Sequence, residues 1–234
     1  MFADLAALLD AVPPDADHAA YRRAVQDENV LGKRTASTRL WAYKKLRELY
    51  ALDPAVPTYA ELRARWDAAP SEGRSLLALL AAMARDSLLR ASAPAVVACR
   101  PGEPVTRDTL RGAVVAARGS RFSDETLKAV VSHLATSWTE SGHLVGTKAK
   151  TRARAAATPA ASAYALALGY LAGARGARLF DTRWTSVLDL PAAAVREHAR
   201  EASRRGWLRY RGVEEIVELD FPHLREAVVP APLA

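Results

Sequence analysis

Apolar residues recur with a helical period along the first hundred positions of the chain. Between prolines and a glycine, this pattern predicts helices over residues 2–9, 16–27, 37–52 and 58–66. Ser37 or Thr35 is the expected N-cap of the third helix, and Thr58 that of the fourth. A longer helix is predicted over residues 72–91, opened by Ser71. Because its middle is almost entirely apolar, we expect it to form the buried centre of an N-terminal bundle.

The pattern changes at residues 94–104, which contain three prolines and a glycine and predict a domain boundary. Helices are predicted over 106–117 and 123–141, joined by a tight turn over 119–122. The second of these helices carries a continuous apolar face, formed by Leu127, Val130, Val131, Leu134 and Trp138. Gly142 is expected to end it, and residues 143–155 show no helical period.

No internal repeat of fixed period is found, but the order helix, turn, helix and hairpin is expected to occur a second time in the last third of the chain. Thr158 and Pro159 predict an N-cap followed by proline at the first helical position, and the helix extends to residue 171. A short helix over 182–188 and a longer one over 191–205 follow. Residues 207–211 and 215–220 then alternate around Gly212, as in a β-hairpin, and the tail from Pro222 is expected to be irregular.

These elements predict a mainly α fold, with an N-terminal helical bundle followed by winged-helix-like helix-turn-helix modules that carry short β-hairpins. The corresponding domains are residues 1–104, 105–157 and 158–234. The five tryptophans are interpreted as core or domain-packing residues.

Composition adds a candidate partner and a compartment. The chain has 234 residues, a formal net charge of +7 and a sequence pI near 9.8, which favours a polyanionic partner. Cys99 is the only cysteine, so an internal disulfide and a cysteine-based zinc site are excluded. No apolar run approaches the roughly 18 residues of a membrane span, and the first residues lack the basic region of a signal peptide. We therefore expect a cytoplasmic protein with no membrane contact.

The clearest local signal is a run in which every second residue is cationic. If residues 146–154 formed a strand, a period of two would place four charges on one face, at a spacing that suits a phosphate backbone. These charges belong to Lys148, Lys150, Arg152 and Arg154. Because a helix-turn-helix precedes them, the layout resembles a winged helix, with Lys128 on the candidate recognition helix. A solvated basic loop is the alternative interpretation.

A second basic stripe lies on the predicted helix 191–205. It consists of Arg196, Arg200 and Arg204, and the charge continues through Arg205, Arg209 and Arg211. This arrangement also fits a recognition helix with its hairpin, but Glu197 and Glu201 can neutralise it as a salt-bridged surface. A third cluster, interpreted as surface charge, comprises Lys33, Arg34, Arg39, Lys44, Lys45 and Arg47.

Motifs for catalysis are lacking in the sequence. It contains no Walker-type phosphate loop, no HExxH and no GxSxG, and no two of its five histidines stand at metal-ligand spacing. We therefore expect a protein that is not an enzyme, with no catalytic residue, no cofactor and no metal.

Several segments resemble the BrxA family, the small accessory proteins of bacterial BREX phage-exclusion systems. The resemblance covers roughly residues 25–220, and it is carried by Asn29-Val30-Leu31-Gly32-Lys33-Arg34-Thr35, Ser37-Thr38-Arg39-Leu40, Lys45-Leu46-Arg47-Glu48-Leu49, Ala84-Arg85-Asp86-Ser87-Leu88-Leu89, Phe122-Ser123-Asp124-Glu125-Thr126-Leu127-Lys128 and Trp138-Thr139-Glu140-Ser141-Gly142-His143-Leu144. It implies an all-helical N-terminal part, winged-helix character, DNA binding and no catalysis.

The sequence therefore leaves three alternative functions. The first is a non-enzymatic accessory protein that binds double-stranded DNA in a phage-defence system, with other defence proteins as further partners. The second is a winged-helix transcriptional regulator, which would recognise a specific operator. The third is a helical scaffold that binds partner proteins, in which the basic surfaces serve solubility alone.

Overall fold

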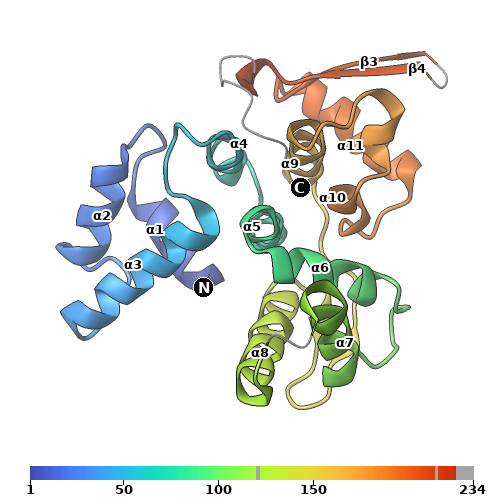
Figure 1. Ribbon diagram of the computed structural model, residues 1–234. Helices are drawn as coiled ribbons and strands as arrows, with labels where there is room; N and C mark the ends of the chain where they lie inside the picture. Colours follow the sequence, from blue (N-terminus) through green and yellow to red (C-terminus); the bar gives the residue numbers. More distant parts are fainter. Residues whose placement is uncertain (120–121, 214–215, 225–234) are drawn as a thin grey trace.

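Helices form most of the protein, in agreement with the predicted mainly α class. The computed structural model describes residues 1–119, 122–213 and 216–224. The first six α-helices are α1 (Phe2–Ala11), α2 (His18–Gln26), α3 (Ala36–Tyr50), α4 (Pro57–Trp66), α5 (Ser71–Arg85) and α6 (Ser87–Val97). Figure 1 shows α5 near the centre, with α1–α3 on one side of it. Its residues from Leu76 to Ala84 are all buried, as the apolar pattern predicts.

The predicted long helix over 72–91 is wrong, because the chain forms two helices there. Asp86 adopts an extended conformation, and its Oδ1 accepts hydrogen bonds from the amides of Leu88 and Leu89 at 2.9 and 3.0 Å. This N-cap starts α6 in a new direction. Pro94, which was expected in a linker, lies inside α6.

Four other helices have a threonine or serine N-cap at or next to the start that the sequence predicts. The side chains of Thr35, Thr106, Ser123 and Thr158 each accept a hydrogen bond from the amide three residues later. The expected cap at Thr58 is wrong, because α4 begins at Pro57 with Val56 as its N-cap. Proline's fixed φ and missing amide hydrogen suit the first helical position.

The middle of the chain contains α7 (Arg107–Arg118), α8 (Asp124–Glu140), β1 (Leu144–Val145) and β2 (Thr151–Arg152). The two short strands pair antiparallel, with Leu144 opposite Arg152. Residues 102–105 lie along the other edge of β2, where the Arg152 amide donates to the Glu103 carbonyl and the Val105 amide to the Lys150 carbonyl. The hairpin is thereby tied to the segment that leads into α7. The turn predicted over 119–122 falls partly outside the described residues.

The last part contains α9 (Pro159–Leu171), the 3-10 helix η1 (Gly176–Phe180), α10 (Arg183–Ser186), α11 (Ala192–Arg204), β3 (Arg209–Val213), β4 (Ile216–Asp220) and η2 (Pro222–Leu224). The hairpin is present, but the prediction that it turns around Gly212 is wrong, since Gly212 lies within β3 opposite Val217. Residues 214–215 and the tail from residue 225 lie outside the described residues.

One continuous core joins these parts. Helix α9 is buried from Ala160 to Gly169 and packs against α4, α5 and α11. The buried apolar side chains form a single cluster that extends from Leu5 to Leu224. Because a single shared core does not locate boundaries within the chain, the division into residues 1–104, 105–157 and 158–234 stays a prediction. In the described part of the chain, no helix is long and apolar enough to cross a membrane.

Candidate nucleic-acid interface

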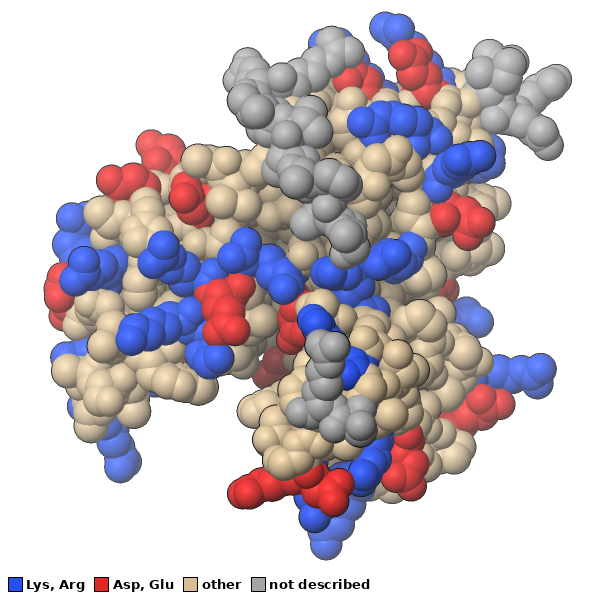
Figure 2. Space-filling model, viewed as in Figure 1, with Lys and Arg blue, Asp and Glu red and all other residues tan. Residues whose placement is uncertain are grey.

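One stretch of the chain with a large excess of positive charge includes the β1–β2 hairpin. Between residues 146 and 183 the sequence has seven Lys and Arg but a single acidic residue, Asp181. The net charge of this stretch is therefore about +6, with histidine counted as neutral. On the face shown in Figure 2, Lys and Arg side chains also extend from the N-terminal helices across the middle of the molecule, with acidic side chains between them.

The β1–β2 hairpin presents part of this charge to solvent. Lys148 and Arg154 are exposed, and Lys150 is half-buried, with its ammonium donating to the Gly146 carbonyl. Gly146 has φ +100°, and a Cβ at this position would lie 2.2 Å from the Ala149 carbonyl oxygen. A glycine is therefore required for the tight turn that holds the two lysines in place.

Arg152 does not share this exposed face, so the prediction of four aligned surface cations is wrong. Its side chain is buried and donates hydrogen bonds to the Val96 carbonyl and to the Asp189 carboxylate. Strand pairing extends over only two residues in β2, and the position opposite Leu144 points into the core. The guanidinium can occupy this position because acceptors surround its fixed array of donors.

The two lysines face a groove with a volume of about 410 Å³. We call it the hairpin groove; it lies between the start of α7, the middle of α8 and the β1–β2 turn. Its polar lining consists of Arg107, Lys148, Lys150 and four hydroxyl residues, Thr106, Ser132, Thr136 and Thr147. Among the described residues, no carboxylate lines it. A surface of this kind donates hydrogen bonds and carries positive charge, both of which suit phosphate oxygens.

Arg107 was not predicted from the sequence as a residue of this site. It stands 41 positions before Lys148 in the sequence, and only the pairing of residues 102–105 with β2 brings it to the hairpin. The N-cap at Thr106 was predictable, and it fixes Arg107 as the first residue of α7.

Lys128 is exposed on α8, one helical turn before Ser132 of the hairpin groove. The first turn of α8, however, carries Asp124 and Glu125, and Arg111 pairs with Asp124 at 2.9 Å. These carboxylates suit the positive end of the helix dipole but would repel phosphates. The side of α8 next to the groove, and not its N-terminus, is thus the better candidate surface.

On α11, the predicted pairing of glutamates with neighbouring arginines is confirmed. Glu197 accepts from Arg200 at 3.0 Å, and Glu201 accepts from Arg204 and Arg205 at 2.7 and 2.8 Å. Hydrogen bonds from these arginines lower the pKa of both glutamates. The remaining arginines of this surface stand over aromatic rings or beside acids across the hairpin: Arg196 over Phe180, Arg209 near Asp220 at 3.7 Å and Arg211 near Glu218 at 4.0 Å.

The third cluster is also partly paired, since Lys33 binds Asp4 at 2.7 Å and Lys45 binds Glu48 at 2.8 Å. Trp41 contradicts the expectation of buried tryptophans, because it is 58% exposed at the edge of this cluster.

The described residues contain no group of three or more side chains that could hold a metal ion. One buried polar cluster went unnoticed in the sequence: the Ser141 hydroxyl lies 2.8 Å from His143 Nδ1, while His143 Nε2 donates to the Val187 carbonyl at 2.8 Å. Burial is the main cause that lowers the pKa of His143, and Arg152 adds to it. Because Ser141 and His143 are both buried, this cluster joins the hairpin to the loop after α10 as packing.

Comparison of the chain with protein-family models, curated proteins and solved structures gave no match.

Proposed function

We propose that this protein binds double-stranded DNA without catalysing a reaction on it, as an accessory protein of a bacterial phage-defence system of the BREX type. The hairpin groove is the observation that carries the DNA-binding part. Arg107, Lys148 and Lys150 meet there beside four hydroxyl groups, and no described carboxylate lines the groove to neutralise them. Positive side chains with hydroxyl donors are the usual contacts to the DNA backbone.

The order of elements supports a winged-helix interpretation of this part. Helix α6, the extended residues 102–105, helices α7 and α8, and the β1–β2 hairpin follow one another, and the extended segment pairs with β2. In a winged helix, one helix contacts a groove of the duplex and the hairpin contacts the backbone. The same order returns in α9, η1, α10, α11 and the β3–β4 hairpin, and β4 contacts η1. We propose this second stretch as a related module.

Binding should depend little on DNA sequence. On the side of α8 that adjoins the hairpin groove, the exposed residues are Lys128, Ser132 and Thr136. Arginine, asparagine and glutamine, which read base edges with paired hydrogen bonds, are absent from α8 altogether. A regulator that recognises one operator would need such residues, so non-specific backbone contact is the better-supported mode.

The defence role rests on the resemblance of the segments quoted above to the BrxA family. Genes for a methyltransferase, a large ATPase and a phosphatase-like protein beside the gene for this chain would support it. An isolated regulator gene beside an operator would favour transcriptional control instead.

DNA binding is tested by fluorescence anisotropy with two labelled 20-base-pair duplexes of unrelated sequence. We expect comparable affinity for both, and a steep loss of affinity between roughly 50 and 200 mM salt. If neither duplex binds at 50 mM salt, the scaffold function replaces this proposal. If one duplex binds far more tightly and with little dependence on salt, a sequence-specific regulator replaces it.

A further inference from the structure

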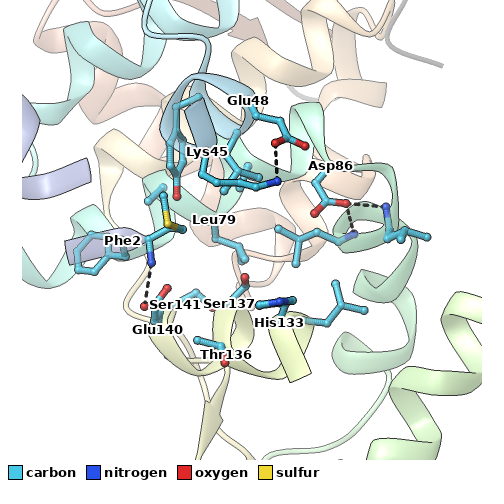
Figure 3. A pocket seen from close by; sticks show the side chains of 18 of the residues that line it. Phe2, Lys45, Glu48, Leu79, Asp86, His133, Thr136, Ser137, Glu140 and Ser141 are labelled. Carbon is cyan, nitrogen blue, oxygen red and sulfur yellow. Dashed lines mark hydrogen bonds and ion pairs between the residues drawn. The ribbon is translucent and has the colours of Figure 1, made fainter. Parts of the chain in front are cut away.

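A cavity of about 320 Å³ lies between α1, α3, α5, α6 and α8. Figure 3 shows Lys45 and Glu48 of α3 on one side of it, Leu79 of α5 at its base, and His133, Thr136 and Ser137 of α8 on the opposite side. This volume is at the lower end of the range in which proteins hold small organic molecules.

The walls of the cavity are mainly apolar. Phe2, Leu49, Leu79, Leu88 and Leu134 contribute to them, and Trp41 stands at the opening with more than half of its side chain exposed. A concave surface with mainly apolar walls favours binding of an apolar molecule over a hydrated one.

The acidic side chains around the cavity already have partners. Glu48 binds Lys45 at 2.8 Å, Asp86 caps α6, and Glu140 lies 3.6 Å from the Met1 amino group. A ligand therefore need not neutralise any of them. An anion is disfavoured in the same space because it would lose its hydration among mainly apolar walls.

Tyr50 differs from these groups. Its side chain lines the cavity and is only 5% exposed, yet its hydroxyl forms no hydrogen bond with any described residue. Burial, together with the negative charges of Glu140 and Asp4, raises the pKa of this hydroxyl well above its ordinary value. The group stays protonated, and its oxygen is accessible to a molecule in the cavity, so it offers a donor inside a mainly apolar space.

We propose that this cavity binds a small, uncharged, mainly apolar molecule that carries one oxygen acceptor, and that the Tyr50 hydroxyl donates a hydrogen bond to that oxygen. The bound molecule would contact α3 and α8 at once. The proposal does not depend on DNA binding, because no residue of the hairpin groove except Thr136 lines this cavity.

Three probe molecules of similar size and shape test which chemical group the cavity prefers. In NMR titrations of the full chain, 4-ethylacetophenone supplies a neutral carbonyl, 4-ethyltoluene lacks the acceptor, and 4-ethylbenzoate carries a negative charge. We expect the ketone to bind with a dissociation constant of roughly 1 mM or below. The hydrocarbon and the carboxylate should each bind at least about fivefold more weakly, because the first forms no hydrogen bond and the second loses its hydration in an apolar space.

Two variants locate the site. Tyr50→Phe should weaken the ketone about fivefold and leave the hydrocarbon unchanged, whereas Tyr21→Phe, which removes a buried hydroxyl outside the cavity, should change neither. Thr136→Trp should fill the cavity from its exposed edge and abolish binding, with Ser132→Trp on the same helix as the matched control. The proposal is overturned if the ketone does not bind, if it binds Tyr50→Phe as tightly as wild type, or if the carboxylate binds best.

Discussion

The guanidinium of Arg152 lies in the interior of the protein, beside the Asp189 carboxylate and the carbonyl of Val96 in α6. Asp189 itself has φ +54°, a left-handed conformation that aspartate tolerates better than most residues. This ion pair therefore joins three segments that are distant in the sequence: the end of α6, the strand β2 and the loop before α11. Its stability depends on both partners, because either charge alone would be buried without compensation.

We predict that Arg152→Ala destabilises the protein by about 3 to 5 kcal/mol, since it leaves the Asp189 carboxylate without its partner. Lys148→Ala, at an exposed position of the same hairpin, should change stability by less than about 0.5 kcal/mol. Urea unfolding of both variants measures the difference. Equal stability of the two variants would show that Arg152 is not packed as described.

A second prediction at this scale concerns His143. Burial is the main cause that lowers its pKa, so the folded protein holds the ring neutral, while the unfolded chain takes up a proton near pH 6.5. The unfolding free energy should therefore fall as the pH drops below about 6.5, by at most about 1.4 kcal/mol per pH unit for this group.

His198 adds to the same trend, because burial lowers its pKa as well. Equilibrium unfolding between pH 5.5 and 7.5 should show a shallower slope in His143→Gln than in wild type. The double variant His143→Gln/His198→Gln should show a shallower dependence of the unfolding free energy on pH than either single variant. A slope that His143→Gln leaves unchanged both in wild type and in His198→Gln would contradict a buried neutral imidazole.

At the scale of elements, the junction between α5 and α6 shows how one side chain redirects the chain. Asp86 accepts two amide hydrogen bonds and starts α6 after α5 has ended at Arg85. We predict that Asp86→Ala lowers stability by about 1 kcal/mol through the lost cap, whereas Asp86→Asn retains most of it. Thermal unfolding of the two variants checks this. A fully stable Asp86→Ala protein would mean that packing alone sets the break.

Local signals explain which elements the sequence predicts well. Helix α9 starts at Pro159 and ends at Leu171, as expected, because the Thr158 cap and the proline act within one turn. The break at Asp86 was not predictable from periodicity, since apolar residues continue through Leu88 and Leu89. Long-range pairing was equally hidden: the position of Arg107 at the hairpin depends on backbone bonds between residues 102–105 and β2.

At the candidate site, too, local features were predictable from the sequence and long-range contacts were not. The exposure of Lys148 follows from the local pattern, because small residues alternate with the cations and leave little to pack. The burial of Arg152 does not follow, because Asp189 and Val96, which receive its hydrogen bonds, are remote in sequence. Pairing of Glu197 and Glu201 with neighbouring arginines was predictable, since helical spacing places them within reach.

At the scale of the whole molecule, the basic surface of α11 and the hairpin groove differ in how many of their cations are paired with carboxylates. The arginines of α11 share Glu197 and Glu201, whereas the hairpin groove has no described carboxylate in its lining. A polyanion would have to displace ion pairs on the first surface but could contact the second directly. We therefore expect the hairpin groove to contribute most of the salt-dependent binding of DNA.

The measurement that tests this account most directly is the salt dependence of duplex binding in two triple variants. In Arg107→Ala/Lys148→Ala/Lys150→Ala, the slope of log affinity against log salt should become shallower by roughly 3 units if all three cations reach phosphates. In Arg200→Ala/Arg204→Ala/Arg205→Ala, which removes three arginines already paired with glutamates, the slope should stay close to that of wild type. With unchanged melting temperatures, a wild-type slope in the first variant would contradict the hairpin groove as the DNA-binding surface.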